Sequence, residues 1–124
     1  MAGEELIEIT KNAYEAWTQG DPQPALDSFA DDIEWIVPGN TALSGTYNGK
    51  DEIMAMWQRL PEHLRGLDTQ YYLSDGERVA VLYNVQLDAG DADQVDVLTF
   101  KDGKVVKYQI SLDTALWEKA FGTK

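Results

Sequence analysis

The chain has no cysteine and only one histidine, His63. The absence of cysteine excludes thiol nucleophiles, disulfides and cysteine-ligated metals, and a single histidine argues against a histidine-rich metal site. We therefore expect no metal and no cofactor. Long apolar runs are also missing, since no segment approaches the roughly 20 apolar residues of a membrane span. The first residues lack the basic and then apolar pattern of a secretory signal, so the sequence predicts a cytoplasmic protein.

Positive charge is scarce as well. The 124 residues include 10 lysines and arginines against 22 acidic residues, which gives a formal net charge of -12. Such a chain repels phosphate backbones, and its basic residues are scattered singly, so nucleic acid and anionic membranes are excluded as expected partners. The acidity itself is typical of a solvated surface. Residues 1–124 fit one domain with enough core to fold without a disulfide or metal.

The first half of the chain has apolar residues at helical spacing. This pattern predicts helices over residues 4–19, 22–29 and 51–60, and a strand at 33–37 that ends at Pro38-Gly39. Residues 40–49 have little periodicity and are interpreted as an ordered loop or a short strand pair.

The second half changes to a period of two. Strands are expected at about 68–74, 77–88 and 93–100, with a fourth after the turn at Asp102-Gly103. Asp113 is placed to cap a short helix that runs to Phe121. Helices first and an antiparallel meander afterwards predict an α+β fold, with the helices packed on one face of a curved sheet.

Asp96 is a lone carboxylate in a segment, 95–100, that otherwise has the composition of a buried strand. An ionised carboxylate is too costly to bury alone, so Asp96 must reach solvent, accept hydrogen bonds or remain protonated. A protonated acid in an apolar pocket can carry out proton transfer. Asp96 is therefore the candidate catalytic residue.

The register of the last hairpin decides which way Asp96 points. A two-residue turn pairs Phe100 with Val105, whereas a three-residue turn with a bulge at Gly103 pairs Phe100 with Lys104 and Asp96 with Tyr108. We favour the three-residue turn because it gathers most of the apolar side chains of both strands, together with Asp96, on one face.

Strand 77–88 leaves a second choice open. Its odd-numbered face, from Val79 to Leu87, is more apolar than the face that carries Asn84. If the odd-numbered face points outward, it forms a dimer surface and Asn84 looks into the pocket beside Asp96. If it points inward, Asn84 is solvated and the argument for a dimer weakens.

Several segments together resemble one family. They are WTQGD at 17–21, FADDIEW at 29–35, PG at 38–39, LSGTYNGKDEI at 43–53, DGKVV at 102–106 and DTAL at 113–116. The chain resembles the SnoaL-like and ketosteroid-isomerase-like branch of the nuclear transport factor 2-like superfamily over essentially its whole length. The resemblance implies a cone, in which helices fold against a strongly curved sheet around an apolar pocket, and a homodimer through the outer sheet face.

The resemblance assigns chemical roles residue by residue. In ketosteroid isomerases a carboxylate base moves a proton while a tyrosine and a protonated aspartic acid hold the enolate. Asp96 falls on the protonated-acid position, but the base position is Val37 and the tyrosine position is Ala13. Tyr14 is the neighbour of Ala13, turned about 100° around the helix. Trp57 matches an aromatic residue that lines the family's pocket.

These positions do not support steroid isomerisation by that mechanism. SnoaL-like cyclases need essentially one acid to shuttle a proton, which is compatible with Asp96 alone. We expect an acid/base enzyme acting on an apolar oxygenated molecule such as a polyketide, terpene or steroid-like ring. The alternative is a non-catalytic ligand-binding or dimerisation module. The expected substrate-binding residues are Tyr14, Trp35, Val37, Trp57, Asn84, Leu98, Tyr108 and Ile110.

Overall fold

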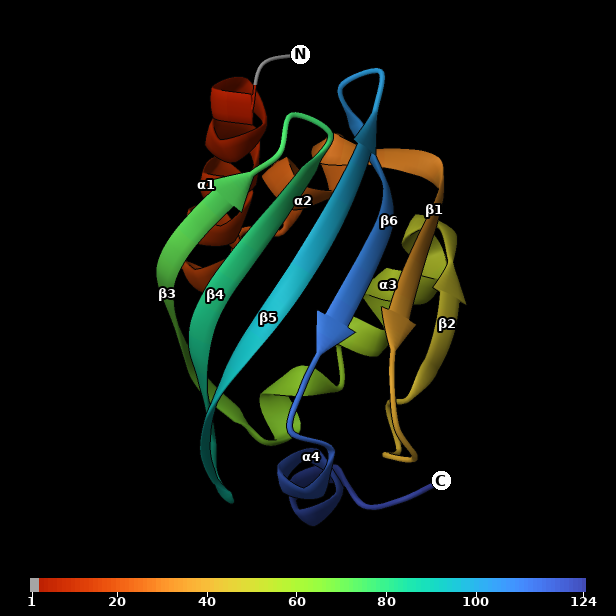
Figure 1. Ribbon diagram of the computed structural model, residues 1–124. Coiled ribbons are helices and arrows are strands. Elements are labelled where there is room, and N and C mark those ends of the chain that lie inside the picture. The colour runs from red at the N-terminus through yellow and green to blue at the C-terminus, as the bar shows by residue number, and fades with distance from the viewer. Residues whose placement is uncertain (1–2) are drawn as a thin grey trace.

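The computed structural model describes residues 3–124 as one sheet with helices packed against it (Figure 1). Its helices are α1 (Gly3–Thr18), α2 (Gln23–Ser28), α3 (Gly49–Trp57), the 3-10 turn η1 (Leu60–Glu62) and α4 (Thr114–Phe121). Its strands are β1 (Phe29–Val37), β2 (Gly45–Asn48), β3 (Leu64–Ser74), β4 (Arg78–Leu87), β5 (Gly90–Lys101) and β6 (Lys104–Ser111). The predicted α+β class is confirmed.

The six strands lie in the order β2-β1-β6-β5-β4-β3. All neighbours are antiparallel except β1 and β6, which run parallel. Figure 1 shows α1, α2 and α3 behind the curved sheet and α4 at one end of it. The sheet and helices thus form the cone expected from the resemblance, and no helix within residues 3–124 is long and apolar enough to cross a bilayer.

The inward face of β4 is the apolar one. Val79, Val81, Tyr83, Val85 and Leu87 are all buried and belong to the core, while the residues between them are only half-buried. Burying this face removes the most apolar surface from water, which is the main force holding the sheet against the helices. Asn84 consequently lies on the outer face of the sheet.

The last hairpin begins in the register of the two-residue turn and then departs from both registers that the sequence allowed. Lys101 pairs with Lys104 across a two-residue turn, in which Asp102 and Gly103 both have positive φ, of 53° and 77°. Phe100 pairs with Val105, and a bulge after it brings Leu98 opposite Tyr108.

The preferred three-residue turn was therefore wrong, and Asp96 pairs with Ile110 rather than Tyr108. The bulge has a physical reason. Val105 and Tyr108 are buried whereas Val106 between them is not, so the extra residue keeps large apolar side chains on the inner face despite the short turn. The prediction that Asp96 faces inward is confirmed, because Asp96 is only 3% exposed.

Local signals placed most element ends within a few residues. The side chain of Asp113 accepts a hydrogen bond of 3.0 Å from the amide of Leu116, as expected of an N-cap. The segment 40–49 contains β2, which pairs with β1. The second helix begins one residue later than predicted, at Gln23, whose amide donates to Asp21 Oδ1 at 3.1 Å.

Candidate functional site

A cavity of about 100 Å³ lies between the helices and the inner face of the sheet. Its wall is mostly apolar and aromatic. Asp96 is the one carboxylic acid that lines it among residues 3–124, and no lysine, arginine or histidine does. The other polar side chains of the wall are Tyr14, Ser28, Tyr83, Gln94 and Tyr108.

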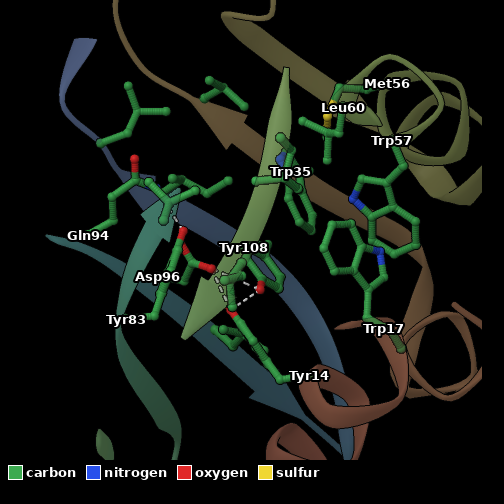
Figure 2. Close-up of a pocket in the computed structure, with 18 of the residues that line it drawn as sticks. Tyr14, Trp17, Trp35, Met56, Trp57, Leu60, Tyr83, Gln94, Asp96 and Tyr108 are labelled. Atoms are coloured by element: carbon green, nitrogen blue, oxygen red, sulfur yellow. Dashed lines mark hydrogen bonds between the residues drawn. The ribbon is translucent and has the colours of Figure 1, made fainter. Parts of the chain in front are cut away.

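Asp96 lies in the middle of β5, where strand alternation turns it toward the helices. The hydroxyl of Tyr83 donates a hydrogen bond of 2.7 Å to its Oδ1. The hydroxyl of Tyr108 donates to its Oδ2 at 3.1 Å, and the hydroxyl of Tyr14 donates to the same oxygen. The hydroxyls of Tyr14 and Tyr108 are also within hydrogen-bonding reach of each other. Because each phenol has one proton, the two hydroxyls can fill only two of these three contacts when Asp96 is ionised. Figure 2 shows these side chains converging on one point from α1, β4, β5 and β6.

This environment changes the acidity of Asp96. Burial raises the pKa of Asp96 from its ordinary value of 3.8 to about 6, although the three tyrosine hydrogen bonds stabilise the carboxylate and act in the opposite direction. Burial and the adjacent carboxylate hold the pKa of Tyr14, Tyr83 and Tyr108 well above the usual range. The phenols therefore stay protonated near neutral pH, and Asp96 is the group that can change its protonation state.

A second layer of hydrogen bonds fixes the direction of one phenol. The indole of Trp117 has only a donor, and it donates to Gln94 Oε1. The other end of that amide, Nε2, donates to Tyr83 Oη at 2.9 Å. Because Tyr83 already accepts this bond, its own proton points to Asp96 Oδ1. Helix α4 thereby fixes the orientation of a hydrogen bond to the acid.

Aromatic rings line the side of the cavity near α1 and α3. The indole of Trp35 stacks on Tyr108 with ring centroids 3.9 Å apart and an angle of 16° between the planes. Trp57 meets Trp35 edge-on at 5.7 Å, and Trp17 meets Trp57 at 5.9 Å. The indole nitrogen of Trp35 is buried and has no hydrogen-bond partner within residues 3–124.

The structure brings most of the predicted site residues together. Besides Asp96, seven of them line the cavity, namely Tyr14, Trp35, Val37, Trp57, Leu98, Tyr108 and Ile110. Asn84 does not. Its side chain is on the outer face of β4 and donates to Asp93 Oδ1 at 3.1 Å. The apolar face of β4 is the one that packs against the helices, so the side chain of Asn84 points away from the cavity.

Sequence reasoning missed three contributors, Tyr83, Gln94 and Trp117. Tyr83 is the residue that strand alternation places in the cavity once Asn84 is outside it. Its position in an otherwise aliphatic face was the available signal. Tyr14, the neighbour of the Ala13 that stands at the tyrosine position of the resemblance, reaches Asp96 from its place on α1 despite its different angle on the helix.

The arrangement supports one kind of chemistry. A buried carboxyl that titrates near neutral pH can donate a proton and then be stabilised as the carboxylate by the phenols around it. Val37 supplies no base, and within residues 3–124 no cluster of histidine and acidic side chains is placed to hold a metal ion.

Solved structures with the same fold cover nearly the whole chain. A nuclear transport factor 2-like protein of unknown function from Burkholderia pseudomallei is 27% identical with a TM-score of 0.81, and the match covers 94% of this chain and 97% of that one. TerC, co-crystallised with polyporic acid, is 26% identical with a TM-score of 0.78 over 96% and 99%. A protein from a soil-derived mobile gene cassette has a TM-score of 0.87 at 22% identity, over 96% and 98% of the two chains.

Curated relatives add little on function. An uncharacterised protein of Mycobacterium tuberculosis and one of Mycobacterium bovis are each 31% identical over 55 residues. The match spans 44% of this chain and less than half, 42%, of the length of those relatives. The model of the SnoaL-like domain, in contrast, matches residues 10–108. With that match and the fold described above, the chain belongs to the SnoaL-like domain family, within the nuclear transport factor 2-like superfamily.

Proposed function

We propose that this protein is an acid/base enzyme that binds an apolar, oxygenated small molecule in the cavity and transfers a proton to it from Asp96. The substrate class is a polyketide, terpene or steroid-like ring. The observation that carries the proposal is the buried carboxyl itself, whose pKa is raised to about 6 at the wall of an apolar cavity. The small-molecule complex of TerC supports a ligand of this general kind.

The hydrogen bonds define a route for the proton. In the neutral acid, Oδ1 accepts the proton of Tyr83, whose oxygen accepts from Gln94, so the proton of the acid is placed on Oδ2. From Oδ2 the proton passes to the Tyr14 hydroxyl while Tyr14 gives its own proton to Tyr108. In the same concerted step Tyr108 gives its own proton to a substrate oxygen in the cavity, so that neither tyrosine gains or loses a net proton. The products of this transfer are a protonated substrate and the Asp96 carboxylate, which keeps the hydrogen bond from Tyr83.

The single acid limits the reactions that are possible. No second carboxylate or histidine among residues 3–124 lines the cavity, so a substrate that is already acidic, or that loses its own proton to water, suits the site best. Cyclisation and isomerisation of enolisable rings meet this requirement.

The test is Asp96→Asn, assayed for turnover of a panel of enolisable aromatic and alicyclic ketones by proton exchange at the carbon next to the carbonyl. We expect turnover to fall by ~100-fold or more while ligand binding persists. If turnover survives with an unchanged pH profile, Asp96 takes no part in the proton transfer. Tyr72→Phe serves as control, since Tyr72 lies beside Tyr14 with ring centroids 6.1 Å apart and its hydroxyl has no partner within residues 3–124.

The alternative is a ligand-binding module without catalysis. It is favoured by Val37, which occupies the place of the base in the resemblance and lines the cavity without an ionisable group. Tight binding of a ligand with no proton exchange in either the unchanged protein or the Asp96→Asn variant would support it.

Residues 1–124 are proposed to act as one domain and to form a homodimer through the outer sheet face. The inward direction of the apolar face of β4 weakens the argument for this dimer, and its remaining support is the half-buried or exposed apolar side chains of the outer face, among them Tyr71, Leu73, Leu82 and Val97. Apolar patches on a surface are typical of interfaces. Sedimentation equilibrium of Leu82→Glu against the unchanged chain tests the dimer, and the expected cytoplasmic location stays a prediction.

A further inference from the structure

Only two buried side-chain nitrogen or oxygen atoms in residues 3–124 have no hydrogen-bond partner, and one of them lines the cavity. They are Trp35 Nε1 and Tyr72 Oη, and Trp35 is the one in the cavity wall. Trp35 is 7% exposed. Buried polar groups nearly always find a partner, so an unpaired donor in a cavity wall needs an explanation. Its N–H can only donate, so what it requires is an acceptor.

The indole is held in place by its neighbours. It stacks on Tyr108 at 3.9 Å, meets Trp57 edge-on at 5.7 Å, and lies 6.3 Å from the ring of Phe29. These contacts on several sides keep the ring from turning to seek an acceptor elsewhere. Figure 2 shows Trp35 between the tyrosines around Asp96 and the side chains of α3. The donor is therefore preorganised for a ligand.

One aromatic residue links Trp35 to the acid. The ring on which Trp35 stacks, Tyr108, carries the hydroxyl that lies 3.1 Å from Asp96 Oδ2. Trp35 and Asp96 thus line the same cavity, and Tyr108 contacts both of them. A rigid molecule that reaches both must have two oxygens on one ring system.

The absence of basic side chains from the described cavity wall indicates which chemical group carries the second oxygen. No lysine, arginine or histidine lines the cavity in the described part of the chain, so a carboxylate or phosphate beside Trp35 would be buried without a counter-ion. A neutral carbonyl accepts from the indole without that cost. The tryptophan and phenylalanine rings around it suit a planar aromatic frame.

We propose that Trp35 is the specificity-determining residue of the site, and that its indole N–H recognises a ketone carbonyl on an aromatic ring system whose second oxygen, an enolisable carbonyl or the hydroxyl that it becomes on enolisation, binds at Asp96 and Tyr108. This inference rests on the proposed function for the location of the site and adds the substrate class. It assigns Trp35 no part in proton transfer.

The experiment compares two probes that differ by one oxygen. The first is 6-hydroxy-1-tetralone, and the second is 5,6,7,8-tetrahydro-2-naphthol, which has the same bicyclic frame and hydroxyl but no ketone. Both are neutral at pH 6. Binding to the unchanged protein, to Trp35→Phe and to Trp57→Phe is measured by calorimetry. Trp57→Phe is the matched control, because it shortens a neighbouring tryptophan of the same wall whose indole nitrogen is not one of the buried atoms without a partner in residues 3–124.

An NMR measurement tests the hydrogen bond of Trp35 in the unchanged protein. The chain has four tryptophans, and the indole N–H signal missing from the spectrum of Trp35→Phe identifies Trp35. In the unchanged protein, the ketone probe should move this signal downfield and slow its exchange with solvent. The probe without the ketone should do neither.

We expect the unchanged protein to bind the ketone probe about threefold to tenfold more tightly than its partner, as one hydrogen bond provides. Trp35→Phe should lose that preference and Trp57→Phe should keep it. Equal binding of both probes, with the Trp35 signal unmoved, overturns the role of Trp35 but leaves the pocket intact. Failure of both probes to bind the unchanged protein overturns the inference and the proposed substrate class together.

Discussion

Tyr83 donates its hydroxyl proton to Asp96 Oδ1 across 2.7 Å, and the amide of Gln94 keeps that proton from pointing anywhere else. The bond joins neighbouring strands on the inner face of the sheet. It stabilises the carboxylate more than the neutral acid, and so it lowers a pKa that burial raises. The pKa of Asp96 is therefore set by the balance between burial, which raises it, and the hydrogen bonds from the tyrosines, which lower it.

The first prediction concerns that balance. Tyr83→Phe removes the donor to Oδ1 and leaves burial unchanged, so the pKa of Asp96 should rise from about 6 by roughly 1 to 2 pH units. Carbon-13 NMR of the aspartate carboxyl measures it. Tyr72→Phe removes a hydroxyl that has no partner within residues 3–124, and it should leave the pKa where it is. Equal effects of the two substitutions would refute the role of Tyr83.

The second prediction links the same acid to stability. The pKa of Asp96 is about 6 in the folded protein, above an unfolded value of about 3.9. Between these values the folded state binds more protons, so the stability contributed by Asp96 is fully present below about pH 3.9 and is lost as pH rises through 6. The tyrosines around it stay protonated over this range because their pKa values are raised.

Asp96→Asn should remove this dependence. Between pH 3.5 and 7 the unchanged protein should lose about 3 kcal/mol more unfolding free energy than the variant. Urea titrations across the pH range measure it. The other acidic residues are the same in both proteins, so their contribution cancels in the difference. A variant with the same slope as the unchanged protein would mean that the pKa of Asp96 is the same in the folded and unfolded states.

The third prediction concerns the last hairpin. Asp102 has a φ of 53°, in the left-handed region that disfavours residues with a Cβ. Asp102→Ala should lower the unfolding free energy by about 1 kcal/mol, because alanine lacks the short polar side chain that makes this region tolerable. Asp102→Gly should cost nothing or stabilise slightly. Lys101→Ala is the neighbouring control, and thermal unfolding measures all three. A harmless Asp102→Ala would contradict the two-residue turn.

Local signals were enough to predict the fold. The helical spacing of the first half, the period of two in the second half and the cap at Asp113 each report on nearby residues, and the structure confirms them. The bulge between Val105 and Tyr108 could not be predicted from local signals. It depends on which large side chains the helices can cover, and this becomes known only when the sheet and helices meet.

The site could be predicted only in part, because some of its residues are set by local patterns and others by how the sheet and helices meet. Asp96 is the one charged residue of segment 95–100, so the sequence identifies it directly. The inward direction of β5 and β6 was predicted by placing their apolar side chains on one face. The choice between Tyr83 and Asn84 depended on which face of β4 is covered, which is a property of the whole sheet. Tyr14 was expected at the pocket, but its direct hydrogen bond to Asp96 was not, because its angle on the helix differs from that of the family's tyrosine.

The proposed function requires Asp96 to change its protonation state near neutral pH inside the cavity. The carbon-13 chemical shift of the aspartate carboxyls as a function of pH measures this change, with the Asp96 signal assigned by its loss in Asp96→Asn. We expect a midpoint of about 6 for this signal. A midpoint near the ordinary value of about 3.9 or lower would mean that the carboxyl is an ionised structural acceptor for the tyrosines, and Asp96 would then not be the proton donor.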